Sequence, residues 1–126
     1  MKYVIIGAGV ASIEAAKAIR QQDRTGEILM LSIDSYVHSR CMLHKFIAGE
    51  RDEKGLDFTE QDFFETYQIS WINGVRVEKI IPDKKEIILD TKETISYDKL
   101  LLANGADSFI PPVGQLRQAS NVFGLR

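Results

Sequence analysis

The sequence predicts an α/β fold in three layers, with a parallel β-sheet and a small antiparallel β-meander. An apolar run, a helix with one apolar face and a second apolar run follow one another over residues 2–33, a βαβ pattern that implies parallel strands. Short, partly alternating apolar runs with turn residues between them fill positions 69–97, as in antiparallel strands. An almost continuously apolar run at 99–103 is typical of a strand buried on both faces of a parallel sheet.

The first crossover has clear limits in the sequence. We expect a strand at Lys2–Ile6, a helix at Val10–Gln21 and a second strand at Ile28–Ile33 after a turn at Thr25 and Gly26. The apolar face of the helix is made by Ile13, Ala16 and Ile19. The parallel sheet is therefore predicted from Lys2–Ile6, Ile28–Ile33 and Leu100–Ala103.

The middle of the chain is less regular. Arg40–Ala48 resembles a short helix, and Thr59 with Asp62 resembles an N-cap pair before a second helix that carries Phe63, Phe64 and Tyr67. A clear turn is predicted at Pro82–Lys85. The short β-runs are Ile69–Ile72, Val75–Ile81, Glu86–Leu89 and Thr94–Tyr97, and the antiparallel set is predicted from Val75–Tyr97.

Composition excludes several classes of protein. The 126 residues are 44% hydrophobic and 27% charged, as expected for one folded domain. The net charge of -2, without a run of basic residues, argues against a nucleic-acid partner. No apolar run approaches the roughly 20 residues that cross a bilayer, so we expect no membrane segment and a cytoplasmic protein. Cys41 is the only cysteine, so no internal disulfide can form.

A glycine loop joins the first strand to the first helix. It reads Gly7-Ala8-Gly9-Val10-Ala11-Ser12. A pyrophosphate needs backbone N–H groups at the positive end of a helix without side chains in the way, and Gly7 and Gly9 supply that clearance. Ser12 occupies the position where a third Gly or Ala allows close packing of helix and strand. Serine is only slightly larger, and we expect it to be tolerated.

An acidic residue follows at the expected spacing. Asp34 ends the next strand 22 residues beyond Ser12, close to the separation of about 20 at which a carboxylate binds the ribose hydroxyls of a dinucleotide. Taken alone, Asp34 could equally be a solvated turn residue. Strand, glycine loop, helix, strand and acid in this order predict a Rossmann-like FAD/NAD(P)-binding domain.

Two longer segments resemble a known family. The segment Leu31-Ser32-Ile33-Asp34-Ser35-Tyr36-Val37-His38-Ser39-Arg40-Cys41-Met42-Leu43-His44-Lys45 resembles the Y-x-R-P-x-L-S-K stretch of the rubredoxin reductase, ferredoxin reductase and NADH-dependent nitrite reductase flavoproteins. These are a branch of the FAD-dependent pyridine nucleotide-disulfide oxidoreductases. The segment Ile95-Ser96-Tyr97-Asp98-Lys99-Leu100-Leu101-Leu102-Ala103-Asn104-Gly105-Ala106 looks like the family's I-x-Y-D-K-L-L-L-A-T-G-A. The residues Asn121 to Arg126 resemble the approach to the family's NAD domain, so the resemblance covers the whole chain.

The resemblance implies FAD as cofactor and assigns roles to individual residues. Arg40 would add positive charge beside the phosphates, and Lys45 would lie near the flavin ring as a catalytic cation that stabilises the reduced, anionic flavin. The backbone at Val77 would meet the adenine, and Asn104 with Gly105 would close the loop over the cofactor. The complete implied cofactor-binding set is Gly7, Gly9, Val10, Ala11, Ser12, Asp34, Ser35, Arg40, Lys45, Val77, Ala103, Asn104 and Gly105.

Three residues depart from the family pattern. Asn104 replaces the usual Thr, and we expect it to take the sharp turn before glycine. His44 replaces Ser, and Cys41 replaces Pro. Without the resemblance, Arg40 and Lys45 would be interpreted as solvated helix charges.

Cys41 has two open interpretations. Related NADH oxidases, NADH peroxidases and coenzyme A disulfide reductases carry a redox cysteine in about this region, and a thiolate beside Arg40 would be chemically sensible. Those enzymes usually follow the cysteine with glycine, whereas Met42 follows here, so a small core residue is the alternative. His38, Cys41 and His44 are spaced by threes, but such positions drift around a helix, and no metal is predicted.

The resemblance implies that NAD(P)H passes a hydride to FAD, with electrons going on to rubredoxin, ferredoxin or a nitrite reductase centre. No second G-x-G-x-x-G is present, so we expect residues 1–126 to be an N-terminal FAD-binding domain that lacks the NAD-binding domain. Such a chain should oxidise NAD(P)H poorly by itself. Two alternatives are an NADH oxidase or coenzyme A disulfide reductase that uses Cys41, and a non-catalytic nucleotide-binding module.

Overall fold

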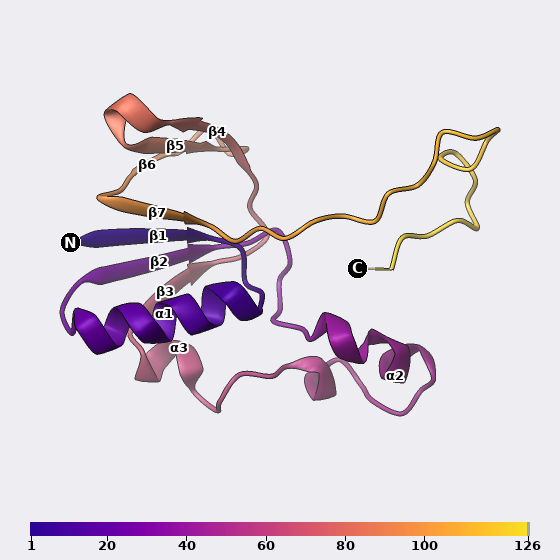
Figure 1. Cartoon of the computed structure of the whole chain (residues 1–126), viewed down its shortest axis with the longest axis horizontal. Helices are drawn as coiled ribbons and strands as arrows, with labels where there is room; N and C mark the ends of the chain where they lie inside the picture. Colours follow the sequence, from indigo (N-terminus) through magenta and orange to yellow (C-terminus); the bar gives the residue numbers. More distant parts are fainter. Residues whose placement is uncertain (126) are drawn as a thin grey trace.

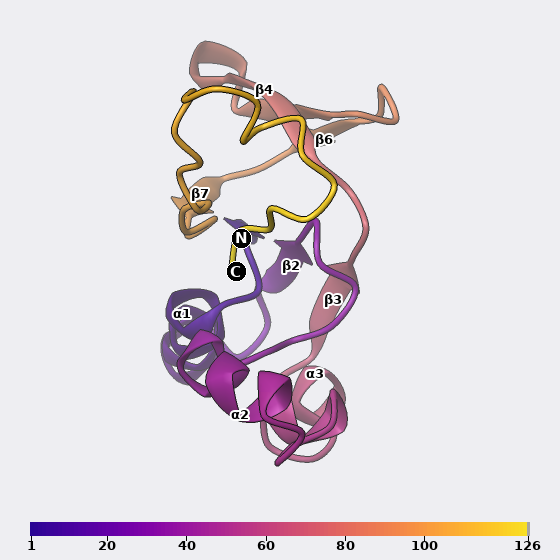
Figure 2. The same cartoon turned by 90° about the vertical axis from the view of Figure 1, so that its right-hand side faces the viewer.

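The computed structural model describes residues 1–125, and it has the predicted three layers (Figure 1). A parallel sheet forms the middle layer, with helices on one face and an antiparallel sheet on the other, as both views show (Figure 2). The strands of the parallel sheet lie in the order β3, β2, β1, β7. Their bounds are β1 (Lys2–Ile6), β2 (Glu27–Leu31), β3 (Ile69–Ile72) and β7 (Lys99–Leu102).

The two central strands bury both of their faces. Successive side chains of a strand point to opposite faces, so Ile5 of β1 packs toward the helices and Val4 toward the antiparallel sheet. Met30 and Leu29 divide in the same way on β2. The apolar runs of β1 and β2 are therefore nearly continuous, as is typical of parallel strands.

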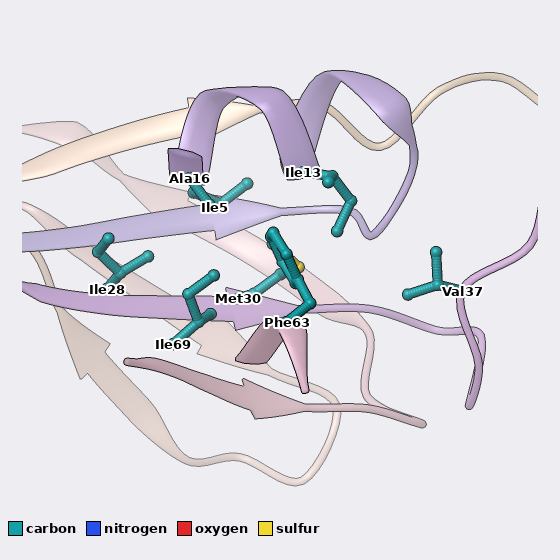
Figure 3. Close-up of a cluster of buried hydrophobic side chains, with 8 residues drawn as sticks. All are labelled: Ile5, Ile13, Ala16, Ile28, Met30, Val37, Phe63 and Ile69. Atoms are coloured by element: carbon teal, nitrogen blue, oxygen red, sulfur yellow. The ribbon is translucent and has the colours of Figure 1, made fainter. Parts of the chain in front are cut away.

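The helical layer rests on the sheet through α1 (Val10–Gln22) and α3 (Phe63–Thr66). Ile13 and Ala16 of α1 are fully buried and Ile19 is half-buried, which confirms the predicted apolar face. Figure 3 shows this core between α1, the sheet and the residues that follow β2. Its buried members are Ile5, Ile13, Ala16, Ile28, Met30, Val37, Phe63 and Ile69.

The antiparallel sheet consists of β4 (Val77–Ile81), β5 (Glu86–Leu89) and β6 (Thr94–Ser96). A 3-10 turn, η3 (Pro82–Lys84), joins β4 to β5 and ends at Lys85 with φ +52°. Ile87, Leu89 and Ile95 form a second core with Val4, Leu29 and Leu31 of the parallel sheet. The predicted meander and its turn are confirmed.

Three strand predictions differ from the structure. The run at Ile69–Ile72 pairs with β2 in the parallel sheet, where we expected only three strands. β2 ends at Leu31 because Ser32 and Ile33 already turn away from the sheet. The strand at the end of the chain is wrong in its predicted burial, because β7 lies at the sheet edge with Leu101 37% and Leu102 58% exposed.

The connection between β2 and β3 contains short helices only. The predicted helix Arg40–Ala48 is divided into η1 (Arg40–Met42) and α2 (Leu43–Ile47), and η2 (Lys54–Leu56) follows. The predicted N-cap pair is wrong. Thr59 donates its hydroxyl to Asp57 instead, and Asp62 has φ +55°, outside the extended region that capping residues adopt. No helix within residues 1–125 is long and apolar enough to cross a membrane.

Candidate dinucleotide-binding site

A cleft of about 740 Å³ opens where the parallel strands end. Its walls come from the glycine loop, the segment after β2, strand β4 and the loop after β7. In open α/β sheets ligands bind at the carboxyl ends of the strands, so the cleft lies where a nucleotide is expected. The predicted cofactor residues along its lining are Gly7, Gly9, Val10, Ala11, Asp34, Arg40, Val77, Ala103, Asn104 and Gly105.

Gly7 is required by the fold itself. Its N–H donates to the Leu31 carbonyl at 2.7 Å, and its φ is +120°, a conformation that side chains disfavour. A Cβ at this position would lie 2.2 Å from the carbonyl oxygen of Ala103. The glycine loop therefore packs backbone against backbone on the end of β7.

Gly9 has no such constraint from the protein. It is the N-cap of α1, with φ -87°, and a Cβ there would meet no atom within 4 Å. No side chain caps the helix, and the first N–H groups of a helix lack partners within it. The glycine at position 9 thus leaves open space in front of backbone donors, which is the arrangement that binds phosphate.

Ser12 lies beneath the loop rather than in the cleft. Its side chain is fully buried, so the serine fits the position that favours Gly or Ala. Its hydroxyl oxygen has no hydrogen-bond partner among residues 1–125. Ser12 therefore serves the close packing of α1, and a direct contact of its side chain with a ligand in the cleft is not supported by this geometry.

Ser32 holds the turn that carries Asp34. Its buried hydroxyl donates to the Asp34 carbonyl at 2.7 Å and accepts the indole N–H of Trp71 at 2.9 Å. Its backbone bonds to Ile72 and Val75. These contacts fix the chain direction after β2, so that half-buried Asp34 lines the cleft. Sequence reasoning missed Ser32, because a serine after a strand has no distinctive signature.

The loop after β7 forms the opposite wall. Gly105 has φ +67°, whereas Asn104 does not adopt a positive φ. The prediction that Asn104 takes the sharp turn is therefore wrong, because the glycine itself accommodates the left-handed conformation. The Arg40 guanidinium reaches this loop and donates to the Ala106 carbonyl at 2.8 Å.

Val77 reaches the cleft from the antiparallel sheet. The pairing of β4 with β5 shifts between Val77 and Lys79, so Glu78 is an extra residue in the strand. Such a bulge bends the strand locally. The bend lies where β4 lines the cleft, and the side chain of Glu78 is held by an ion pair with Lys92.

Ser35 and Lys45 are not among the residues that line the cleft. Ser35 is exposed on the turn after Asp34, and the Lys45 ammonium forms an ion pair with Glu50. A role of Lys45 beside a flavin stays a prediction, and it requires the ammonium to act from outside this lining or to leave Glu50.

Cys41 is exposed and lines the cleft beside Arg40. His38 also lines it, and its Nε2 atom is buried without a partner among the described residues. Within residues 1–125, no group of three or more His, Cys, Asp and Glu side chains is arranged to hold a metal ion.

The clearest electrostatic shift lies at the other end of α1. The backbone N–H groups of Gly26 and then Thr25 donate to the Asp23 carboxylate, and these bonds lower the pKa of Asp23. The Tyr3 hydroxyl donates to the same carboxylate. This network closes the turn between α1 and β2, so its role is structural.

The residues of the cleft fit a dinucleotide. The uncapped start of α1 can bind a pyrophosphate, Gly9 leaves the room for it, and an acidic residue stands at the end of the next strand. The chemistry of this donor set matches the FAD that the sequence predicts.

Comparisons with known proteins agree with this site. A ferredoxin–NAD(+) reductase component of the 3-phenylpropionate/cinnamic acid dioxygenase from Photorhabdus laumondii is 32% identical over 126 residues, covering 98% of this chain and 32% of that protein. The structure of NADH:rubredoxin oxidoreductase from Clostridium acetobutylicum is similar with a TM-score of 0.77 and 30% identity, covering 88% and 30% of the two chains. The putidaredoxin reductase–putidaredoxin complex gives 0.81 and 27%, covering 89% and 27%.

The chain thus spans about a third or less of the length of these relatives. At the level of the family, the match is complete. All of residues 1–126 match the family described as pyridine nucleotide-disulphide oxidoreductase, and the chain belongs to it.

Proposed function

We propose that residues 1–126 form the FAD-binding part of an NAD(P)H-dependent flavoprotein oxidoreductase. The observation that carries the proposal is the uncapped start of α1 behind Gly9, on the wall of a cleft at the ends of the parallel strands. Backbone donors with open space in front of them suit a pyrophosphate. When bound, FAD supplies the two-electron chemistry that accepts a hydride from NAD(P)H.

Each wall of the cleft has a proposed task. The N–H groups at Val10 and Ala11 bind the pyrophosphate, and Asp34 accepts hydrogen bonds from the adenosine ribose. The bent strand at Val77 offers its backbone to the adenine. Ala103, Asn104 and Gly105 cover the cofactor from the side of β7.

The electron acceptor is proposed at the level of its class. One relative is named as a ferredoxin–NAD(+) reductase component, and another as an NADH:rubredoxin oxidoreductase. These names support rubredoxin, ferredoxin or a nitrite reductase centre as the acceptor. The relatives are about three times as long as this chain, and the sequence has one glycine fingerprint, so we propose that the 126 residues alone oxidise NAD(P)H poorly.

A titration of the purified chain with FAD tests the proposal. We expect tighter binding of FAD than of FMN, because FMN lacks the adenosine half that Asp34 and Val77 would contact. Asp34→Asn should weaken FAD binding about tenfold and leave FMN binding unchanged, since a hydrogen bond to a charged group is worth about 1.5–3 kcal/mol. Binding of NAD in preference to FAD, with no flavin absorption bands, would support a non-catalytic nucleotide module instead.

A second candidate function rests on the exposure of Cys41 at the cleft. A redox thiol needs access to its substrate, and this position provides it. An NADH oxidase or coenzyme A disulfide reductase would lose its activity on Cys41→Ser, measured in a polypeptide that carries both nucleotide domains. A reductase that passes electrons to an iron-sulfur protein would keep its activity.

A further inference from the structure

Arg40 connects two walls of the cleft that are far apart in the sequence. It begins η1, after β2, and its Nη1 donates to the carbonyl of Ala106, 66 residues later, at 2.8 Å. Both Arg40 and Gly105 line the cleft. The side chain thus links the segment after β2 directly to the loop after β7.

The guanidinium also packs on Gly105. A Cβ built on Gly105 would lie 3.4 Å from Nη2, 3.6 Å from Cζ and 3.6 Å from Nη1 of Arg40. Nearly equal distances to three atoms of a planar group mean that the group faces the glycine. Arginine can stack and donate at the same time, because its donors lie in the plane of the guanidinium.

The contact continues to the glycine loop. The residues just before Gly105 form the backbone on which Gly7 packs, with Ala103 O only 2.2 Å from a Cβ at Gly7. Arg40, the loop 103–106 and Gly7 therefore form one connected rim. A change at Arg40 reaches the phosphate-binding end of α1 through backbone contacts alone.

We propose that Arg40 is a positioning residue that clamps the loop 103–106 across the cleft and slows the release of the dinucleotide. This inference rests on the proposed function, because it takes FAD to be the occupant of the cleft. It differs from the role that the family resemblance implies for Arg40, in which its charge acts on the phosphates. The clamp acts between two parts of the protein and exists without a ligand.

The two roles predict different kinetics. Loss of a phosphate contact would slow FAD association and make binding less sensitive to salt, because exposed charges act on encounter and are screened. Loss of the clamp speeds dissociation, leaves the salt dependence unchanged and loosens the loop even in the FAD-free chain. Lysine preserves the charge but cannot stack its ammonium face-on, so Arg40→Lys should retain a phosphate contact and lose the clamp.

The test compares wild type with Arg40→Met, Arg40→Lys and a matched control, Arg51→Met. Arg51 is an exposed arginine that donates to the Gly55 carbonyl at 3.0 Å, in a loop outside the cleft. Stopped-flow measurement of FAD release should give roughly fivefold faster dissociation for both Arg40 variants and an unchanged rate for Arg51→Met. Amide hydrogen exchange of residues 104–107, measured without FAD, should be faster in the Arg40 variants only.

The outcomes separate the inference from the proposed function. A wild-type chain that binds no FAD would contradict the proposed function and this inference together. Wild-type binding of FAD with unchanged dissociation in Arg40→Met, or with wild-type behaviour of Arg40→Lys, would overturn the clamp alone. Unchanged amide exchange at 104–107 in the FAD-free variants would overturn it as well.

Discussion

Gly7 and Ala103 are in direct backbone contact, and a Cβ on Gly7 would lie 2.2 Å from the Ala103 carbonyl oxygen. Gly7→Ala should therefore destabilise the fold by about 3 kcal/mol or more, because a methyl group would collide with backbone and φ +120° would be strained. Urea unfolding of the ligand-free variant measures this loss. A free energy of unfolding within about 0.5 kcal/mol of wild type would contradict the packing of the loop on β7.

Ser32→Ala tests the support beneath Asp34. The substitution leaves the indole N–H of Trp71 without its acceptor and the Asp34 carbonyl without its donor. We expect a loss of about 2 kcal/mol in unfolding free energy. The exposed neighbour Ser35 gives the control, because Ser35→Ala should leave stability unchanged. Equal stabilities of the two variants would be inconsistent with the proposed support.

The Asp23 turn predicts a pH dependence of stability. Hydrogen bonds from Gly26 and Thr25 lower the pKa of Asp23 in the folded chain below its unfolded value, near 3.9. Its contribution is therefore fully present above that value and is lost as the pH falls through the lower, folded pKa. Asp23→Asn should be less stable than wild type at neutral pH, and the difference should shrink in acid. A difference independent of pH would contradict this, and exposed Asp83→Asn serves as control.

Lys45→Met tests the predicted cation beside the flavin. If the ammonium stabilises reduced, anionic flavin, its removal should lower the two-electron reduction potential of bound FAD by about 30 mV, which corresponds to about 1.4 kcal/mol. Glu50→Gln removes the carboxylate that pairs with Lys45 and should raise the potential. Potentials unchanged in both variants would leave Lys45 as a surface residue paired with Glu50.

The sequence predicted the parts of the fold that depend on neighbouring residues. Strand, glycine loop and helix over residues 2–22 follow from local periodicity and from glycines at fixed spacing. The turn at Pro82–Lys84 follows from turn chemistry. The place of a strand in the sheet is decided by distant partners, so the pairing of β3 with β2 and the edge position of β7 could not be read from their four-residue runs.

The same distinction holds for the cleft. Gly9 and Asp34 have recognisable spacing because one crossover carries both, and both line the cleft. The bond from Arg40 to Ala106 spans 66 residues and ends on a backbone carbonyl, which no side-chain pattern records. Ser32 escaped prediction for a similar reason, because its partner Trp71 belongs to a strand that the sequence did not assign to this sheet.

Binding of FAD to Gly9→Ala tests the central claim most directly. A Cβ at Gly9 meets no protein atom within 4 Å, and its φ of -87° suits alanine, so the variant should fold with a stability within about 1 kcal/mol of wild type. The methyl group would occupy the space in front of the first turn of α1, where the pyrophosphate is proposed to lie. We predict that wild type binds FAD and that folded Gly9→Ala binds it at least tenfold more weakly. Equal FAD affinity of the two folded proteins would contradict the glycine loop as the dinucleotide site.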